Sequence, residues 1–170
     1  MTMLLYPFIA LSALGLILSI LAHFGALLGL NVPSAAMGLH IGIFVVWFPA
    51  VLVSNSLIKG YDRKDFWKVV LRGAPKWMQY MVYAFMGYAA INFLIFMFFA
   101  PGDPTGSGGM PPSVVRGFSG HWMAFYSAAL AILYSAVQIQ KNGLNRKCPN
   151  GHYVSREATF CEKCGEVVFD

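Results

Sequence analysis

The first 58 residues contain no Asp, Glu, Lys or Arg. A soluble domain of that length would be hard to build, because charged side chains normally cover such a surface. The whole chain has the same character: 58% of its 170 residues are hydrophobic and 11% are charged, whereas about a quarter of residues are charged in soluble domains. The sequence therefore predicts a membrane protein.

Four apolar stretches are long enough to cross a membrane, since a helix needs roughly 20 apolar residues to span about 30 Å of hydrocarbon. They lie at about residues 4–30, 37–58, 77–100 and 118–140. The segment Pro101 to Gly117 is rich in Gly and Pro and is expected to be an irregular, exposed loop. Short connections between consecutive spans favour an antiparallel up-down bundle. We expect an all-α fold in which residues 1–140 form a four-helix transmembrane bundle.

The positive charges indicate how this bundle is oriented. Six of the twelve basic residues fall within 59–76, five follow Gln140, and the two remaining loops share only Arg116. Because basic residues concentrate on the cytoplasmic side, we expect the 59–76 loop and both termini to be cytoplasmic. Nucleic-acid binding needs a dense basic face, and topology accounts for most of the charge here, so no nucleic-acid partner is expected.

Within the 59–76 loop, a short helix is predicted over about residues 62–73, with Asp62 as its N-cap. Lys64, Lys68 and Arg72 recur every fourth residue along one line, and Trp67 belongs to its apolar side. Such a helix would lie on the inner leaflet with its cations facing anionic headgroups. An ordinary interfacial connector and a dedicated lipid or partner site both fit this pattern.

The last thirty residues, 141–170, carry the only three cysteines of the chain, Cys148, Cys161 and Cys164. His152 stands four positions after Cys148, where a fourth ligand is needed. Three thiolates and an imidazole suit a closed, tetrahedral, structural zinc site, and metal binding would supply the folding energy of so short a tail. The alternative is a three-cysteine knuckle that binds metal poorly, with His152 merely solvated.

The tail resembles the bacterial zinc-ribbon modules that read roughly Cys-Pro-x-Cys-Gly, a short β segment and then Phe-Cys-x-x-Cys-Gly. The matching residues are Cys148 to His152 and Phe160 to Gly165. The resemblance implies a zinc ribbon with short β structure. Together with the predicted spans and orientation, it leads us to expect a cytoplasmic ribbon on a multi-pass protein of a bacterial cytoplasmic (inner) membrane. One position departs from the pattern: residue 151 is Gly where the ribbon has a second cysteine, and His152 follows it.

Three further histidines, His23, His40 and His121, are placed by this topology near the outer ends of their spans. At about 1.5 Å of rise per residue their depths differ by about one turn, so the three rings could meet in one layer. Polar groups inside a bilayer suggest a function, and such a group could ligate haem iron or copper. A hydrogen-bonded structural cluster and three unrelated histidines are the alternatives.

No Asp, Glu, Lys or Arg lies within any predicted span, which argues against a proton-coupled carrier. We see no nucleophile–base pair and no phosphate-binding loop, so we expect no enzyme. Asn92 is expected to face the bundle, where it could bond a neighbouring carbonyl group or line a narrow path. Trp77 and Trp122 are expected to anchor at the interfaces.

The favoured function is a membrane adaptor or accessory subunit that contacts lipids and docks a protein through the ribbon, with homo-oligomerisation possible. The main alternative is a membrane redox or metal-handling protein that uses the three histidines. A third alternative is a small permeation unit, an oligomer in which Asn92 lines a pore.

Overall fold

The computed structural model describes residues 2–59, 61–99, 111–141, 147–152, 154 and 158–168. These residues form five α-helices and three short 3-10 turns. The helices are α1 (Tyr6–Leu27), α2 (Gly38–Leu57), α3 (Phe66–Leu71), α4 (Lys76–Phe99) and α5 (Pro112–Lys141). The turns are η1 (Thr2–Leu5), η2 (Ser34–Met37) and η3 (Arg63–Asp65). Within the described part, α1, α2, α4 and α5 are long and apolar enough to cross a membrane, and they correspond to the four predicted spans.

Helix α1 ends at Leu27, three residues before the predicted end of its span, and the chain turns at Gly29. Gly29 adopts a φ of +70°, and the N–H of Leu30 donates to the carbonyl of Gly25 at 2.9 Å. This pairing caps the helix with a glycine in the left-handed conformation. Helix α1 therefore ends early because the chain turns at Gly29, and not because the sequence becomes less hydrophobic.

Helix α5 begins at Pro112, six residues before the predicted start at Phe118. The expectation of an irregular loop up to Gly117 was wrong for this part, while residues 101–110 lie outside the described residues. Proline is well tolerated in the first turn of a helix because its missing N–H would have no partner there. The first helical bond runs from the N–H of Val115 to the carbonyl of Pro111 at 3.1 Å.

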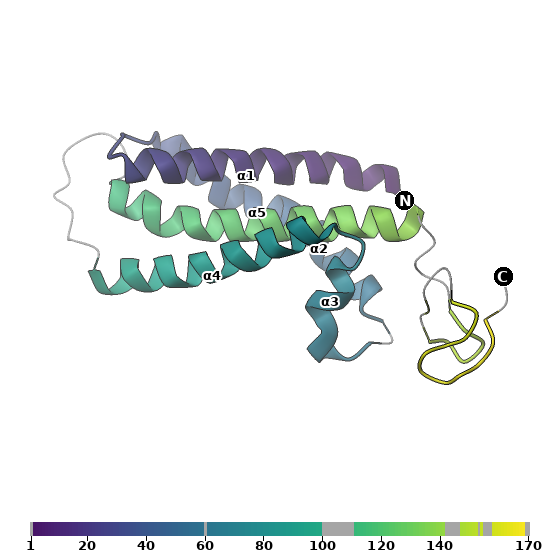
Figure 1. The fold of residues 1–170 in the computed structure, drawn as a ribbon. Helices are drawn as coiled ribbons and strands as arrows, with labels where there is room; N and C mark the ends of the chain where they lie inside the picture. Colours follow the sequence, from purple (N-terminus) through teal and green to yellow (C-terminus); the bar gives the residue numbers. More distant parts are fainter. Residues whose placement is uncertain are drawn as a thin grey trace.

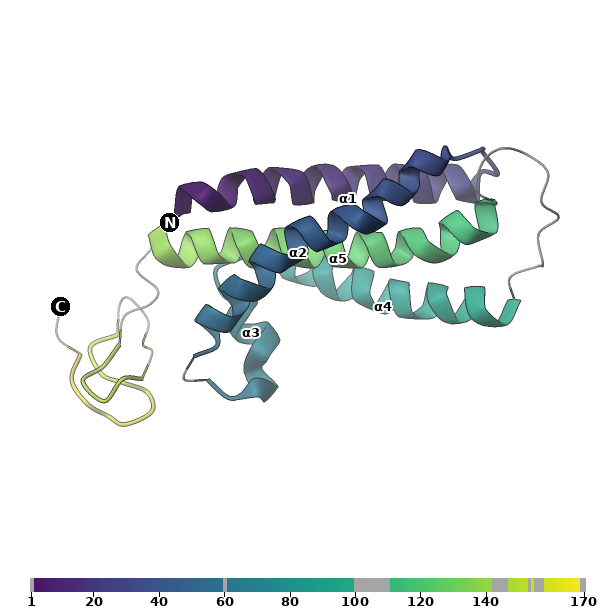
Figure 2. The same ribbon diagram turned by 180° about the vertical axis from the view of Figure 1, so that it is seen from behind.

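The four long helices alternate in direction, as predicted, so the start of α1 and the end of α5 lie at the same end of the bundle (Figure 1). Helix α5 lies in the middle and contacts α1, α2, α3 and α4 (Figure 2). It is the least apolar of the four candidate spans and the most buried. Its buried face is rich in Ala, Ser and Gly, and such small residues let neighbouring helices approach closely.

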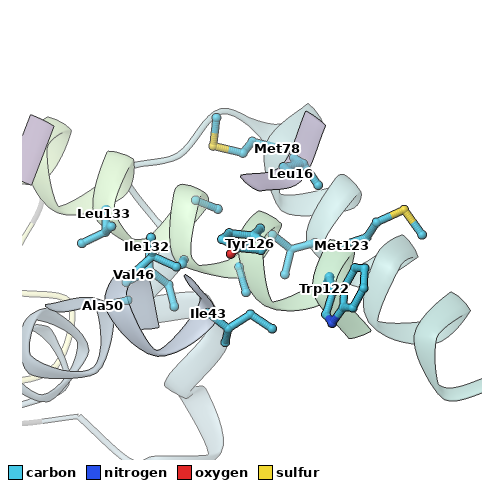
Figure 3. Close-up of a cluster of buried hydrophobic side chains, with 14 of the residues drawn as sticks. Leu16, Ile43, Val46, Ala50, Met78, Trp122, Met123, Tyr126, Ile132 and Leu133 are labelled. Atoms are coloured by element: carbon cyan, nitrogen blue, oxygen red, sulfur yellow. The ribbon is translucent and has the colours of Figure 1, made fainter. Parts of the chain in front are cut away.

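The core lies around α5, where buried side chains of α1, α2, α3 and α4 pack against it (Figure 3). The Tyr126 hydroxyl donates to the carbonyl of Leu39 at 2.8 Å, and the Trp122 indole N–H donates to Nδ1 of His40 at 3.2 Å. The prediction that Trp122 anchors at an interface was wrong, because this side chain is fully buried. Trp77, in contrast, is 62% exposed at the start of α4.

The predicted helix over 62–73 is shorter in the structure: η3 covers its start and α3 its middle. The Asp62 side chain caps no backbone N–H and instead pairs with the Lys64 ammonium at 3.4 Å. Val70 and Leu71 of α3 are fully buried. The N–H of Gly73 donates to the Ser135 hydroxyl at 2.9 Å, which ties the end of this segment to α5.

The predicted short β module is not seen in the described tail residues, 147–152, 154 and 158–168. They contain no strand, although Phe160 and Val167 form an isolated antiparallel bridge and Lys147 is also a bridge residue.

Candidate metal centre

The four predicted ligands, Cys148, His152, Cys161 and Cys164, come together in the tail. Their sulfur and nitrogen atoms all lie within 4.8 Å of one another. The Cys148 sulfur lies 3.7 Å from the Cys164 sulfur and 3.6 Å from His152 Nδ1. Around a tetrahedral ion with metal–sulfur bonds of about 2.3 Å and metal–nitrogen bonds of about 2.0–2.1 Å, ligand atoms are separated by about 3.6–3.8 Å. These two distances match a tetrahedral site, and the four side chains lie close enough together to hold a metal ion.

The first ligand turn runs from Cys148 to His152. The N–H of Cys148 donates to the carbonyl of His152 at 2.9 Å, and the N–H of Gly151 donates to the carbonyl of Cys148 at 2.8 Å. Gly151 has a φ of +79°, which a residue with a Cβ adopts only at a cost. This is the position that departs from the ribbon pattern, and its backbone conformation accounts for the glycine.

The second ligand turn runs from Cys161 to Glu166 and is one residue longer. The N–H of Cys161 donates to the carbonyl of Glu166, and that of Gly165 donates to the carbonyl of Cys161, both at 2.8 Å. Gly165 has a φ of +70° and follows the ligand Cys164.

In the shorter first turn, Asn150 precedes the corresponding glycine. The candidate ligand His152 follows that glycine, and its Nδ1 atom lies near the Cys148 sulfur. Asn150 still contacts the site, because its amide N–H donates to the Cys164 sulfur at 3.5 Å.

The environments of the cysteines differ. Cys148 and Cys161 are buried, together with Val154 and Val168, whereas Cys164 is exposed. Burial raises the pKa of the Cys148 thiol. The backbone N–H of Glu166 and then the Asn150 amide lower the pKa of Cys164 to about 6. Cys164 is therefore mainly a thiolate at neutral pH, the form of cysteine that binds metals.

The second ligand turn lies beside the connection between α2 and α3. The Lys163 ammonium lies 5.6 Å from the centre of the Tyr61 ring, and the Arg72 guanidinium lies 5.3 Å from the same centre. Arg72 also donates to the Tyr61 hydroxyl at 2.6 Å. Both cations lie within the usual range of a cation–π contact, so Tyr61 connects the tail to the helical part of the chain.

The four residues predicted to face lipid are divided among different contacts. Arg72 contacts Tyr61, as described, while Lys64 and Lys68 make exposed ion pairs with Asp62 and Asp65 at 3.4 and 3.3 Å. Trp67 is half-buried and lines an apolar groove of about 300 Å³ between α2 and α4, with Trp47 and His121. Lipid contact by this segment stays a prediction.

The three membrane histidines have separate partners. His23 is buried between the hydroxyls of Ser119 and Tyr88. His40 accepts the Trp122 N–H, and His121 Nδ1 lies 3.4 Å from the carbonyl of Gly117. Among the described residues, the tail cluster is the one group of three or more His, Cys, Asp or Glu side chains brought within metal-binding distance. The structure does not bring His23, His40 and His121 together.

The polar partners of His23 were not found from the sequence. Serine and tyrosine are common in membrane helices, and which face they occupy depends on how the helices are rotated. Asn92 does behave as predicted: it is buried, and its amide N–H donates to the carbonyl of Arg116 at 2.7 Å. Comparisons with protein families, with curated proteins and with solved structures found no match to this chain.

Proposed function

We propose that this chain is a non-enzymatic membrane adaptor or accessory subunit. In this proposal its helices anchor a small zinc module that binds a cytoplasmic protein. The observation that carries it is the closed set of four ligand side chains in the tail, held beside Tyr61 at the end of the bundle where both termini lie. A compact recognition module held close to a membrane suits docking of a partner.

Zinc is the ion that this ligand set favours. Three thiolates and one imidazole are soft or borderline ligands, which zinc accepts in structural tetrahedral sites, whereas calcium and magnesium require oxygen ligands. Catalytic zinc sites keep one position open for water, whereas four protein ligands close the sphere. We therefore assign the ion a structural role, in which its binding energy stabilises a tail with few buried apolar side chains.

The orientation follows from the basic residues and from cysteine chemistry. The tail and the 59–76 segment hold eleven of the twelve basic residues, so we assign that end of the bundle to the cytoplasm. A reducing compartment keeps thiols available for metal. Together with the resemblance to bacterial zinc ribbons, this favours a multi-pass protein of the bacterial inner membrane with both termini inside. Lipids would surround its helices, and self-association is compatible with this placement.

Affinity purification of the full-length chain in a mild detergent tests the adaptor role. The doubly substituted chain Cys161→Ser, Cys164→Ser removes two ligands, and Glu162→Gln alters a neighbouring side chain that is not a ligand. We expect a specific partner to co-purify with the wild type and with Glu162→Gln but not with the double variant. The same partners on all three chains, with equal membrane insertion, would contradict the proposal.

A further inference from the structure

A groove of about 360 Å³ runs between α1 and α4, and α5 contributes one side chain to its lining. Its walls are mainly apolar and include Phe24, Leu27, Phe85 and Met123. Two polar side chains interrupt them, His23 from α1 and Tyr88 from α4. The groove lies at the end of the bundle opposite the two termini, because Leu27 is the last residue of α1 (Figure 1).

The polar side chains belong to one hydrogen-bond chain. The Tyr88 hydroxyl contacts His23 Nε2, His23 Nδ1 lies 2.7 Å from the Ser119 hydroxyl, and that hydroxyl donates to the carbonyl of Arg116 at 3.2 Å. A neutral imidazole has one donor and one acceptor nitrogen. When Ser119 donates to Arg116, His23 donates through Nδ1 and accepts the Tyr88 proton at Nε2.

The same chain can run in the opposite direction. Ser119 then donates to His23 Nδ1, and His23 donates through Nε2 to the Tyr88 oxygen. The carbonyl of Arg116 keeps a partner, because the Asn92 amide also donates to it at 2.7 Å. This reversal leaves no buried acceptor of the hydrogen-bond chain without a donor. It also frees the O–H of Tyr88 to donate to a molecule in the groove, because the Tyr88 side chain is 38% exposed.

Arg116 adds a positive charge to the α5 face that carries Ser119 and Met123. Arg116, Ser119 and Met123 are spaced three and four residues apart and so share one face of the helix. Arg116 is exposed, Ser119 is in the polar layer, and Met123 lines the apolar part. Arg116 lies about 10 Å from Met123 along the axis, at about 1.5 Å per residue. It is the only Lys or Arg between Lys76 and Lys141.

We propose that the α1/α4 groove binds one phospholipid molecule. The order of groups along α5 matches the order of groups in such a lipid. The Arg116 guanidinium binds the phosphate, the Tyr88 hydroxyl donates to an ester carbonyl, and an acyl chain lies against Ile20, Phe85 and Met123. A guanidinium is well suited to phosphate because it forms charge-assisted hydrogen bonds.

Binding of dioleoyl phosphatidylglycerol to the delipidated full chain in detergent tests this site, with the unfolding midpoint and native mass spectrometry as readouts. We expect one retained lipid and a raised midpoint. Arg116→Gln should weaken binding roughly tenfold, since it removes a bond to a charged group, and Tyr88→Phe roughly two- to tenfold. Tyr83→Phe is the matched control, because Tyr83 is exposed on the same helix and is not part of the groove lining.

Two further probes separate the lipid from its parts. Dioleoylglycerol, which lacks the phosphate, should bind wild type about as weakly as phosphatidylglycerol binds Arg116→Gln. Inorganic phosphate alone should give no shift, because it makes no contact with the apolar walls. Equal binding of phosphatidylglycerol to the wild type and Arg116→Gln would overturn the proposal, as would an equal response to inorganic phosphate.

Discussion

The ring of Tyr126 on α5 lies directly against Gly15 on α1. A Cβ atom placed on Gly15 would lie 2.5 Å from Cδ1 and 2.6 Å from Cζ of that ring. The Tyr126 hydroxyl continues to α2, where it approaches Gly42 and donates to the carbonyl of Leu39. One side chain thus joins three of the four long helices, and it does so because two glycines leave room for it.

Gly15→Ala should therefore destabilise the bundle by roughly 1–3 kcal/mol, because the added methyl group overpacks the core. Gly87→Ala is the matched control, since a Cβ atom at Gly87 would meet no packed neighbour within 4 Å among the described residues. That control should be neutral or stabilising by up to about 1 kcal/mol, as expected for Gly to Ala in a helix. Unfolding in mixed micelles of mild detergent and dodecyl sulfate measures both; equal stabilities would show that the Tyr126 contact is not tight.

The membrane spans were predictable because length and hydrophobicity alone decide which segments can cross a bilayer. The grouping of Cys148, His152, Cys161 and Cys164 was predictable because their spacing is set by covalent reach within two short turns. Both are local properties of the chain.

The surroundings of the buried polar residues were not predictable. Trp122 stands close enough to a helix end to suggest an interfacial anchor, but α5 is the central helix, and most of its side chains are covered by the other helices. The small residues of α5, such as Ser127 and Ala129, indicate that other helices pack closely against it. They do not indicate which helix packs against which face of α5. The rotation of each helix about its axis depends on contacts such as that of Tyr126 with Gly15, which join residues far apart in the sequence.

Trp122→Phe should destabilise the protein by roughly 1–3 kcal/mol, through lost packing and the lost hydrogen bond to His40. Trp77→Phe makes the same change at an exposed position and should remain within about 0.5 kcal/mol of wild type. The comparison uses the same unfolding measurement. A larger effect at Trp77 would mean that Trp77, and not Trp122, supports the bundle.

Metal analysis of the purified full-length chain should find one zinc ion per molecule. Cys161→Ser should abolish stoichiometric zinc after desalting, because the hydroxyl of serine is a poor replacement for a thiolate ligand. Glu162→Gln, one position along, should retain it. Zinc at the wild-type ratio in Cys161→Ser would exclude the four-residue site.

His152 has a test of its own, since a solvated histidine is the alternative. If His152 is a ligand, His152→Ala should lower zinc affinity by roughly tenfold or more, because even the loss of a residue that only hydrogen-bonds to a ligand lowers metal affinity by about tenfold or more. It should also change the visible spectrum of the cobalt-substituted protein by replacing nitrogen with water. Unchanged affinity and spectrum would leave a three-cysteine site.

Ser119→Ala should destabilise the bundle by roughly 1–3 kcal/mol, because the buried ring of His23 loses the partner of Nδ1. Ser127→Ala is the same substitution on the same helix, also fully buried. The Ser127 hydroxyl bonds its own helix, at the carbonyl of Ala124, so this change should stay within about 0.5 kcal/mol of wild type. Unfolding in mixed micelles separates the two, and His23→Leu in the Ser119→Ala background should recover part of the loss by removing the unpaired group. If both serine variants lose equal stability, the contact between His23 and Ser119 contributes no more than an ordinary bond within one helix.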